Sequence, residues 1–177
     1  TLKKMIKSYH ITLISVGNGT ASRESEQIIV ELLKEIPEKV QYIITNEAGA
    51  SVYSASKLAT EEFPNFDVGQ RSAASIARRL QDPLAELVKI EPKAIGVGQY
   101  QHDLPASQLK QRLDFVVSKA VNLVGVNVST ASPELLINVS GLSAASAKSI
   151  VDYRYSNGGN SSRKELIRIT KIGAKRF

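Results

Sequence analysis

The N-terminal third of the chain alternates short apolar runs with segments of helical periodicity. Residues 11–16 (ITLISV) and 40–45 (VQYIIT) are rich in β-branched and aliphatic side chains, and turn-forming residues follow each run. Between them, residues 22–35 carry apolar side chains every three or four positions, which predicts an amphipathic helix that ends before Pro37. A second helix is predicted over residues 52–62. This order predicts a βαβ unit with two parallel strands that are buried on both faces.

The ends of the two predicted strands carry the polar residues of a candidate site. Asn18 follows the first strand within a tight turn, and Asn46 and Glu47 follow the second strand. In open α/β sheets the binding crevice lies at the carboxyl ends of the strands. We therefore expect Asn18 and Glu47 to lie where a functional site of such a domain would be.

The middle of the chain is predicted to be helical, with one interruption. Helical periodicity covers residues 72–80 and 107–124. Asp82 suits the N-cap of a further helix, and Pro83 suits its first position because the missing N–H costs nothing there. Residues 90–106 contain several Gly and Pro residues, and we predict a loop or linker for them.

Two five-residue segments near the C-terminus repeat one pattern, 30 positions apart. Residues 139–143 (VSGLS) and 169–173 (ITKIG) each place an apolar residue, two turn residues, a second apolar residue and a small residue in that order. Each follows a predicted short helix, at residues 133–138 and 163–168, and precedes a helix that starts with Ala. The arrangement resembles a tandem helix-hairpin-helix motif.

A hairpin placed before a helix presents backbone N–H groups that can bind phosphate. The first N–H groups of a helix have no internal partner and carry partial positive charge, and Gly allows close approach of the backbone. Such binding is independent of base sequence and sensitive to salt. Alternatively, the hairpins only pack helices together, and the first copy serves as structural partner of the second. The residues predicted to bind nucleic acid are Gly141, Leu142, Ser143, Lys148, Lys171, Ile172, Gly173, Lys175 and Arg176.

Positive charge is concentrated in the same region. Residues 127–177 contain 8 Lys and Arg against 3 Asp and Glu, whereas residues 1–126 contain 15 against 14. The last third therefore carries +5 of the net charge of +6. This asymmetry is typical of a polyanion-binding module beside a neutral one, although a solvated basic face without a partner gives the same count.

Composition excludes several other classes of function. The chain is 42% hydrophobic, but no run approaches the ~18 apolar residues of a membrane helix, and no signal-peptide pattern is present. The absence of Cys excludes disulfides, zinc ribbons and thiol catalysis, and the only His residues are His10 and His102. We expect a cytoplasmic monomer that has no metal, no cofactor and no contact with a membrane.

Five longer runs resemble the bacterial Tex family of transcription accessory proteins. They are residues 17–24 (GNGTASRE), 46–56 (NEAGASVYSAS), 77–89 (ARRLQDPLAELVK), 96–103 (GVGQYQHD) and 127–132 (NVSTAS). The resemblance covers essentially the whole chain. It implies a fragment of a larger protein that binds nucleic acid, RNA or DNA or both, and acts with the transcription machinery.

The resemblance also implies the domain organisation. Residues 1–90 would be the latter part of a YqgF, RNase H-like domain, and residues 91–126 a loop and connecting helix. Residues 127–177 would form a tandem helix-hairpin-helix domain whose second motif is truncated. The expected fold class is therefore α/β plus all-α.

An RNase H-like fold raises the question of nuclease activity, which needs several carboxylates around two Mg²⁺ ions. Asn18 is a poor ligand for a hard cation, and Glu47 is a single carboxylate. Where a late helix should supply an acid, the chain has Gln70, Arg71 and Ser72. We therefore predict a degenerate nuclease-like site, formed by Asn18 and Glu47, and no enzymatic activity. The remaining alternative is a protein-interaction scaffold that positions other domains.

Overall fold

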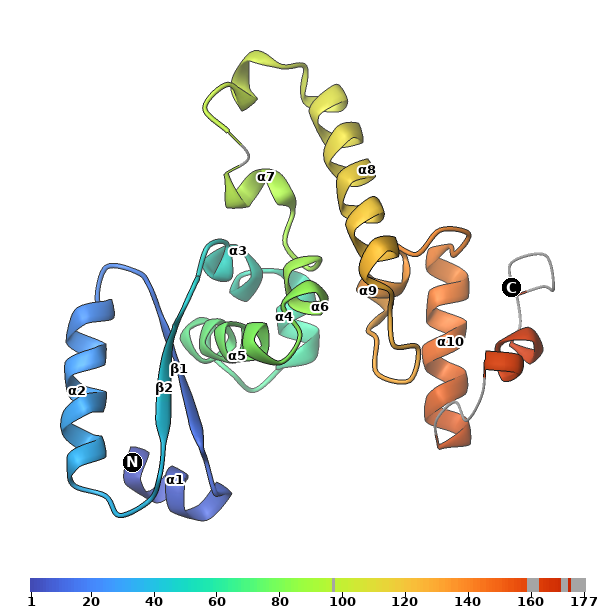
Figure 1. Ribbon diagram of the computed structural model, residues 1–177. Helices are drawn as coiled ribbons and strands as arrows, with labels where there is room; N and C mark the ends of the chain where they lie inside the picture. The colour runs from blue at the N-terminus through green and yellow to red at the C-terminus, as the bar shows by residue number, and fades with distance from the viewer. Residues whose placement is uncertain (97, 159–162, 170–171, 173–177) are drawn as a thin grey trace. The chain divides into compact units, whose positions relative to one another are not determined.

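The computed structural model describes residues 1–96, 98–158, 163–169 and 172, which fall into two compact units (Figure 1). Unit 1 is Thr1–Glu86 and unit 2 is Leu87–Phe177. Unit 1 contains a parallel pair of strands, and the described part of unit 2 is helical. None of the helices in these described ranges has the length and apolar character needed to cross a bilayer.

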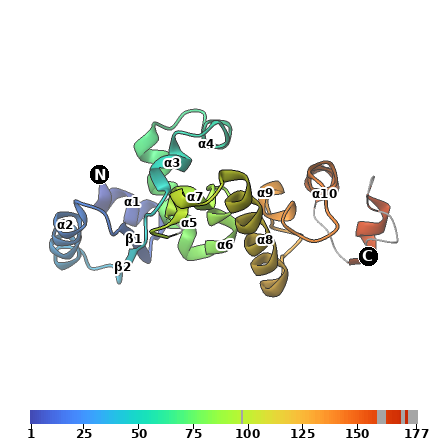
Figure 2. The same ribbon diagram turned by 90° about the horizontal axis from the view of Figure 1, so that it is seen from above.

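Unit 1 is built on the predicted βαβ arrangement. A first helix, α1 (Leu2–Tyr9), precedes strand β1 (Leu13–Gly17) and buries Ile6. Helix α2 (Ser22–Lys34) then connects β1 to β2 (Gln41–Thr45), and the two strands pair in parallel along their full lengths. Figures 1 and 2 place α2 on one side of the strands and α5 on the other. The predicted strands, connecting helix and parallel pairing are therefore confirmed.

The expectation that both faces of the strands are buried is wrong. Val16 and Thr45 are buried, but Leu13, Ile43 and Ile44 are each more than two-fifths exposed. Within the described residues the sheet has only two strands, so too few neighbouring elements are present to cover both faces.

The helix predicted over residues 52–62 is divided into two. Helix α3 (Ala50–Ser54) is followed by α4 (Lys57–Glu62), and the hydroxyl oxygen of Ser56 between them accepts the N–H of Ala59 at 3.1 Å. This N-cap starts a new helix in a new direction. The apolar periodicity across the region did not reveal the interruption.

The two following helices begin at side-chain caps. Helix α5 (Val68–Gln81) starts with a capping box between Asp67 and Gln70, earlier than the predicted residues 72–80. Helix α6 (Pro83–Leu87) begins as predicted, because Asp82 Oδ1 accepts the N–H of Ala85 at 3.0 Å.

Unit 2 contains more helix than the sequence predicted. The predicted loop over residues 90–106 holds two short helices, α7 (Pro92–Ile95) and the 3-10 turn η1 (Gln101–Asp103). Pro92 favours the first of these because proline is tolerated in the first turn of a helix. The long helix α8 (Ala106–Val124) agrees with the prediction.

The C-terminal helices form the core of unit 2. Helices α9 (Pro133–Leu136) and α10 (Ala144–Asn157) pack on each other, and η2 (Arg163–Arg168) is a 3-10 helix at the residues where a short helix was predicted. Apolar side chains in and beside these helices are nearly inaccessible to solvent, among them Val121, Leu136, Ala147, Ile150, Ile169 and Ile172.

Candidate nucleic-acid interface

The first predicted hairpin forms a tight turn between α9 and α10. The N–H of Leu142 donates to the carbonyl of Val139 at 3.1 Å, which closes the turn. Gly141 has a φ of 86°, in the left-handed region that a residue with a Cβ adopts only under strain. The sequence pattern at residues 139–143 therefore predicted both the turn and the need for glycine.

Two serines cap the start of α10 reciprocally. Ser143 Oγ accepts the N–H of Ser146 at 3.2 Å, and Ser146 Oγ accepts the N–H of Ser143 at 2.8 Å. This capping box was missed because serine takes the place of the usual Glu or Gln at its second position. The cap leaves the N–H groups of Ala144 and Ala145 without a partner among the residues that the structure describes.

The surface around this helix start is open to solvent. Gly141, Ser143, Ala144 and Ala145 are exposed, whereas the side chain of Leu142 is half-buried. The N–H groups of Leu142 and Ser143 are already used within the hairpin, so they are not donors for a ligand. The available donors in this turn are the amides of Gly141, Ala144 and Ala145.

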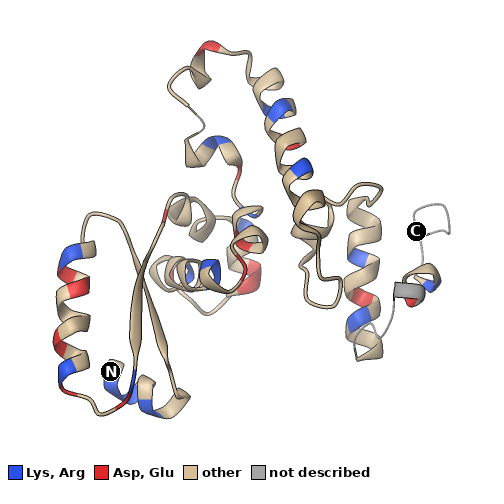
Figure 3. Ribbon diagram, in the orientation of Figure 1, with Lys and Arg blue, Asp and Glu red and all other residues tan. Residues whose placement is uncertain are grey.

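Lys148 lies one turn into α10 from these amides. Its side chain is exposed and forms no ion pair within the described part of the chain. Asp152, one further turn along, is also exposed, and Figure 3 shows that α10 carries both basic and acidic residues. The start of α10 thus combines free amides with one cation, and an acidic residue follows them.

The second hairpin repeats the turn of the first as far as it is described. The N–H of Ile172 donates to the carbonyl of Ile169 at 3.0 Å, as Leu142 does to Val139 30 positions earlier. Ile169 and Ile172 are buried, so the Ile172 side chain belongs to the core and cannot contact a ligand. The other residues predicted to bind here lie outside the described residues: Lys171, Gly173, Lys175 and Arg176.

The C-terminal end of α8 holds the first hairpin in place. Asn122 Oδ1 accepts the N–H of Ser140 at 3.0 Å, and Asn122 Nδ2 donates to the carbonyl of Asn138 at 3.0 Å. Ser118 Oγ donates to the same carbonyl, also at 3.0 Å. Sequence reasoning missed these positioning residues because nothing in the pattern of α8 distinguishes them from the other polar positions of the helix.

In unit 1 the structure brings Asn18 and Glu47 together. The N–H of Glu47 donates to Asn18 Oδ1 at 3.1 Å, and the N–H of Asn18 donates to the carbonyl of Thr45 at 3.0 Å. The carboxylate of Glu47 lies so close to Gly17 and Gly19 that a Cβ at either position would collide with it. Asn18 and Glu47 therefore link the two turns at the carboxyl ends of the strands.

A buried arginine completes this end of the sheet. Arg79 on α5 is 7% exposed, and its Nη1 donates to the carbonyl of Asn46 at 2.7 Å. Burial lowers the pKa of Arg79, while the negative charges of Glu86 and Glu47 act in the opposite direction. Neighbouring Arg78 instead pairs with Glu62 at 3.3 Å. Because Arg79 is buried and hydrogen-bonded to the backbone, its role is structural.

The acidic and His residues do not converge on a common point. Within the described ranges, no three of these side chains are gathered closely enough to hold a metal ion. Glu47 therefore has no neighbouring set of carboxylates among the described residues.

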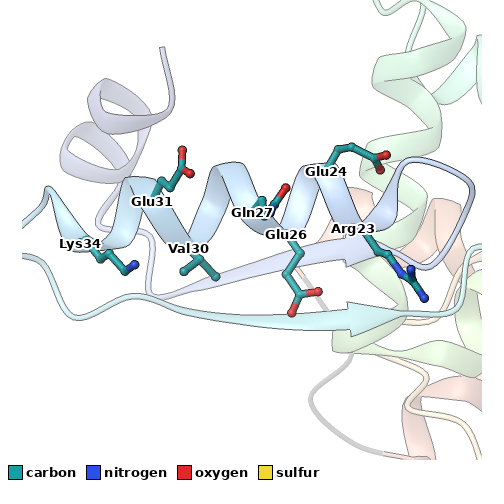
Figure 4. A pocket seen from close by; sticks show the side chains of 7 residues that line it. All are labelled: Arg23, Glu24, Glu26, Gln27, Val30, Glu31 and Lys34. Carbon is teal, nitrogen blue, oxygen red and sulfur yellow. The ribbon is translucent and has the colours of Figure 1, made fainter.

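A surface pocket of about 570 Å³ lies along α2, and none of the predicted site residues lines it. Figure 4 shows Glu26 and Val30 pointing toward the strands, and Glu24 and Glu31 pointing away from them. Glu26 accepts a hydrogen bond from the Tyr42 hydroxyl at 2.8 Å, which raises the pKa of Tyr42. The lining carries both signs of charge and offers no preferred ligand class.

Comparison with known proteins matches the two parts of the chain to two families of domain. Residues 1–81 match the Tex protein YqgF-like domain, and residues 121–177 match the helix-hairpin-helix motif. These matches correspond to the βαβ unit of unit 1 and to the repeated hairpins of unit 2.

Similar proteins occur in bacteria and in animals. The transcriptional accessory protein Tex of Neisseria gonorrhoeae is 55% identical over 178 residues, which covers 100% of this chain and 24% of the relative. Protein YhgF of Escherichia coli is 51% identical, with 100% and 23% covered. The human S1 RNA-binding domain-containing protein 1 is 46% identical over 179 residues, with 99% and 18% covered.

The chain thus spans about a quarter or less of the length of these relatives. The similarity is nevertheless continuous along the chain, and it includes both the strand-end turns of unit 1 and the hairpins of unit 2. From this coverage and the two domain matches, the chain belongs to the Tex family and carries its YqgF-like domain followed by a helix-hairpin-helix motif.

Proposed function

We propose that this chain binds the sugar–phosphate backbone of nucleic acid, without reading base sequence and without cutting the strand, as part of a transcription accessory factor. The observation that carries this proposal is the start of α10. There Gly141, Ala144 and Ala145 are exposed residues whose amides have no partner among the described residues, at the positive end of a 14-residue helix.

Phosphate is the ligand that this surface fits best. Backbone amides at a helix start donate to anionic oxygens, and the helix dipole favours negative charge at the same place. Lys148 adds a mobile cation one turn along, where it can neutralise an adjacent phosphate. None of these groups is arranged to read base edges, so the proposed binding is independent of sequence.

The comparisons with known proteins also support binding of nucleic acid. The match of residues 121–177 to a helix-hairpin-helix motif coincides with the surface just described. One relative is named a transcriptional accessory protein, and another is named for an S1 RNA-binding domain. We extend these names to the present chain only as the setting in which its proposed binding would act.

The absence of strand cleavage is proposed from the strand ends of unit 1. Asn18 uses its side-chain oxygen to hold the Glu47 backbone, and the Glu47 carboxylate lies against a glycine turn. The buried Arg79 interacts electrostatically with Glu47 and with Glu86. These residues support a structural role for Glu47 better than a ligand role. A cleavage assay tests this proposal in a full-length relative with Mg²⁺ or Mn²⁺, beside a variant in which the glutamate equivalent to Glu47 is replaced by alanine. Cleavage by the relative that is lost in the variant would contradict a structural role for Glu47.

The binding proposal is tested by titrating the 177-residue chain with labelled single- and double-stranded RNA and DNA at several salt concentrations. Fluorescence anisotropy gives the dissociation constant at each concentration. We expect binding to oligomers of unrelated sequence with similar affinity, weakening linearly on a log–log plot against salt. No binding at low salt, or affinity that depends on one base sequence, would contradict the proposal.

A protein-interaction role is the second candidate, and the surface of α8 favours it. Phe115, Val116, Leu123 and Val124 are all at least 59% exposed, which is unusual for four large apolar side chains on one helix. If the titration shows no nucleic-acid binding, this face of α8 becomes the better explanation of unit 2.

A further inference from the structure

We propose that the exposed face of α8 is a docking surface for a separate protein, and that it binds an amphipathic helix whose apolar side chains are flanked by Asp and Glu. This inference goes beyond the proposed phosphate binding, because it concerns another helix of unit 2 and holds whether or not the start of α10 binds nucleic acid. It gives the protein-interaction role named above a ligand of stated chemistry.

One side of α8 is already occupied within unit 2. Val121 is fully buried, and the hydroxyl of Ser118 donates to the carbonyl of Asn138. With 3.6 residues per turn, Val116 and Leu123 lie on roughly the opposite side of the helix from Val121 and Ser118. The helix is therefore held in place by one side, while the other side is open to solvent.

The open side of α8 carries an apolar stripe. Val116 and Leu123 are seven residues apart, so they project from the same side of the helix, with Phe115 and Val124 on the flanks. All four are at least 59% exposed, and Leu123 is 77% exposed. Single apolar side chains are ordinary on a protein surface, but several on one helix face form a patch that marks an interaction site. Burial of this patch would drive the docking.

A surface hollow extends the stripe toward the start of α8. Its volume is about 650 Å³, and Leu109 and Phe115 line it together with Leu104, which precedes the helix. Leu104 and Phe115 are more than half exposed, whereas Leu109 is half-buried. Arg112 belongs to the same lining. A large apolar side chain of a partner helix fits such a hollow, as anchor residues do where a helix binds in a groove.

The same face carries positive charge. Arg112 and Lys119 lie in phase with the apolar stripe, four residues before and three residues after Val116. Both cations are exposed, and neither forms an ion pair with a residue that the structure describes. The one acidic residue of α8, Asp114, pairs with Lys110 at 2.7 Å (Figure 3). Carboxylates beside the apolar face of a partner helix would complement the two free cations.

Other occupants fit this face less well. A strand of nucleic acid gains little from Val116 and Leu123, which neither pair with phosphate nor stack on bases. A helix that lies on a membrane carries its Lys and Arg opposite its apolar side chains, whereas here the cations lie among them. A second copy docked through the same face would bring further cations and no compensating acid into the interface. An acidic amphipathic helix satisfies both the apolar and the charged part of the surface.

The experiment measures binding of a labelled synthetic peptide to the 177-residue chain by fluorescence anisotropy. The peptide has about 18 residues, nearly the length of α8, with Leu every three or four positions and Glu at the positions beside them. One control peptide replaces each Glu by Lys, and another replaces each Leu by Ala. A labelled oligonucleotide and vesicles of phosphatidylserine and phosphatidylcholine test the other classes of occupant.

Two double variants remove the two parts of the surface separately. Val116→Gln with Leu123→Gln removes the apolar stripe, and Arg112→Gln with Lys119→Gln removes the cations. Gln is chosen because it is a good helix former. Ile28→Gln is the matched control, since Ile28 is 60% exposed and lies on α2 of unit 1. Circular dichroism confirms that each variant is folded, and the two control peptides test the same contributions without altering the chain.

We expect the acidic peptide to bind the unaltered chain, and the apolar double variant to weaken this binding about tenfold or more. The charge variant should weaken it about threefold to tenfold at low salt and less at high salt, because exposed ion pairs are screened. Ile28→Gln and Lys148→Ala should bind the peptide as the unaltered chain does. The apolar double variant should bind oligonucleotides as the unaltered chain does.

No binding of the acidic peptide, or equal binding of the acidic and the Lys-containing peptide, would overturn the proposal. Loss of vesicle or oligonucleotide binding in the apolar double variant would assign the face to lipid or nucleic acid, and would overturn it as well. If a full-length relative does not bind a peptide that the 177-residue chain binds, the relative's own chain covers the face, and docking of a separate protein is wrong. Failure of the chain to bind any oligonucleotide contradicts only the proposed phosphate binding, and leaves this inference standing.

Discussion

Ser143 and Ser146 exchange hydrogen bonds between hydroxyl and backbone, at 3.2 Å in one direction and 2.8 Å in the other. Both N–H groups would otherwise be left unpaired at the start of α10. The exchange fixes the direction in which the next two amides point, those of Ala144 and Ala145, and so it shapes the proposed phosphate site without touching phosphate.

Removal of this cap should destabilise unit 2. Ser143→Ala deprives the Ser146 N–H of its acceptor, and loss of such a cap costs about 1 kcal/mol. Urea unfolding followed by circular dichroism measures the free energy of unfolding. Ser156→Ala is the control, since Ser156 is exposed and its hydroxyl only donates to the carbonyl of Asp152 within the helix. Equal stability of the two variants would show that the cap contributes nothing.

Gly141→Ala should lower stability through the backbone alone. The φ of 86° is unfavourable for alanine, at about 1–2 kcal/mol, yet no atom lies within 4 Å of the position that the new Cβ would take. Gly98 also has open space around it but has no positive φ, so Gly98→Ala is a matched control that should be close to neutral. If both variants have the stability of the unaltered chain, the hairpin does not require its left-handed residue.

The contact between Gly19 and Glu47 predicts a coupled pair of substitutions. Gly19→Ala should destabilise unit 1, because the new Cβ meets the Glu47 carboxylate. In a Glu47→Ala background, Gly19→Ala should lower the free energy of unfolding by a smaller amount. The difference between the two backgrounds is the coupling energy, which is about 0.5–3 kcal/mol for residues in direct contact. Unfolding free energies of the four proteins in this cycle give the coupling. A coupling of zero would mean that the Glu47 carboxylate moves away from the new Cβ at no cost in stability.

Asp152→Asn should strengthen nucleic-acid binding. The substitution removes an exposed negative charge from the face of α10 that carries Lys148, while the new side chain keeps nearly the same size. Because exposed charges interact weakly in water, we expect less than about a fivefold gain in affinity, and a smaller gain at high salt. Anisotropy titrations at two salt concentrations measure this gain in affinity. Weaker binding by Asp152→Asn would contradict the binding of phosphate beside Lys148 on α10.

Periodicity and local turn chemistry were sufficient to predict much of this fold. The two strands, their parallel pairing through α2 and the helix start at Asp82 all follow from patterns within a few residues. The repeated turn hydrogen bonds at Leu142 and Ile172 likewise follow from two copies of one short pattern.

Other features depend on contacts that no local pattern encodes. The burial of Arg79 requires α5 to pack against the turn at Asn46, which is 33 residues away in the sequence. The interruption at Ser56 depends on a side-chain cap that overrides the apolar periodicity. The short helix α7 begins at Pro92, in a segment whose Gly and Pro residues predicted a loop. Of the candidate site, the sequence located the hairpin, but only the structure shows which amides remain available.

The most direct measurement is the salt dependence of binding by Lys148→Ala. If Lys148 neutralises a phosphate, the substitution weakens binding to every oligomer and lowers the slope of log affinity against log salt by about 0.7–0.9. Lys57→Ala removes an equal charge from an exposed position of unit 1, where Lys57 pairs with Glu61, and should change neither quantity. A slope for Lys148→Ala identical to that of Lys57→Ala and of the unaltered chain would contradict phosphate binding at the start of α10.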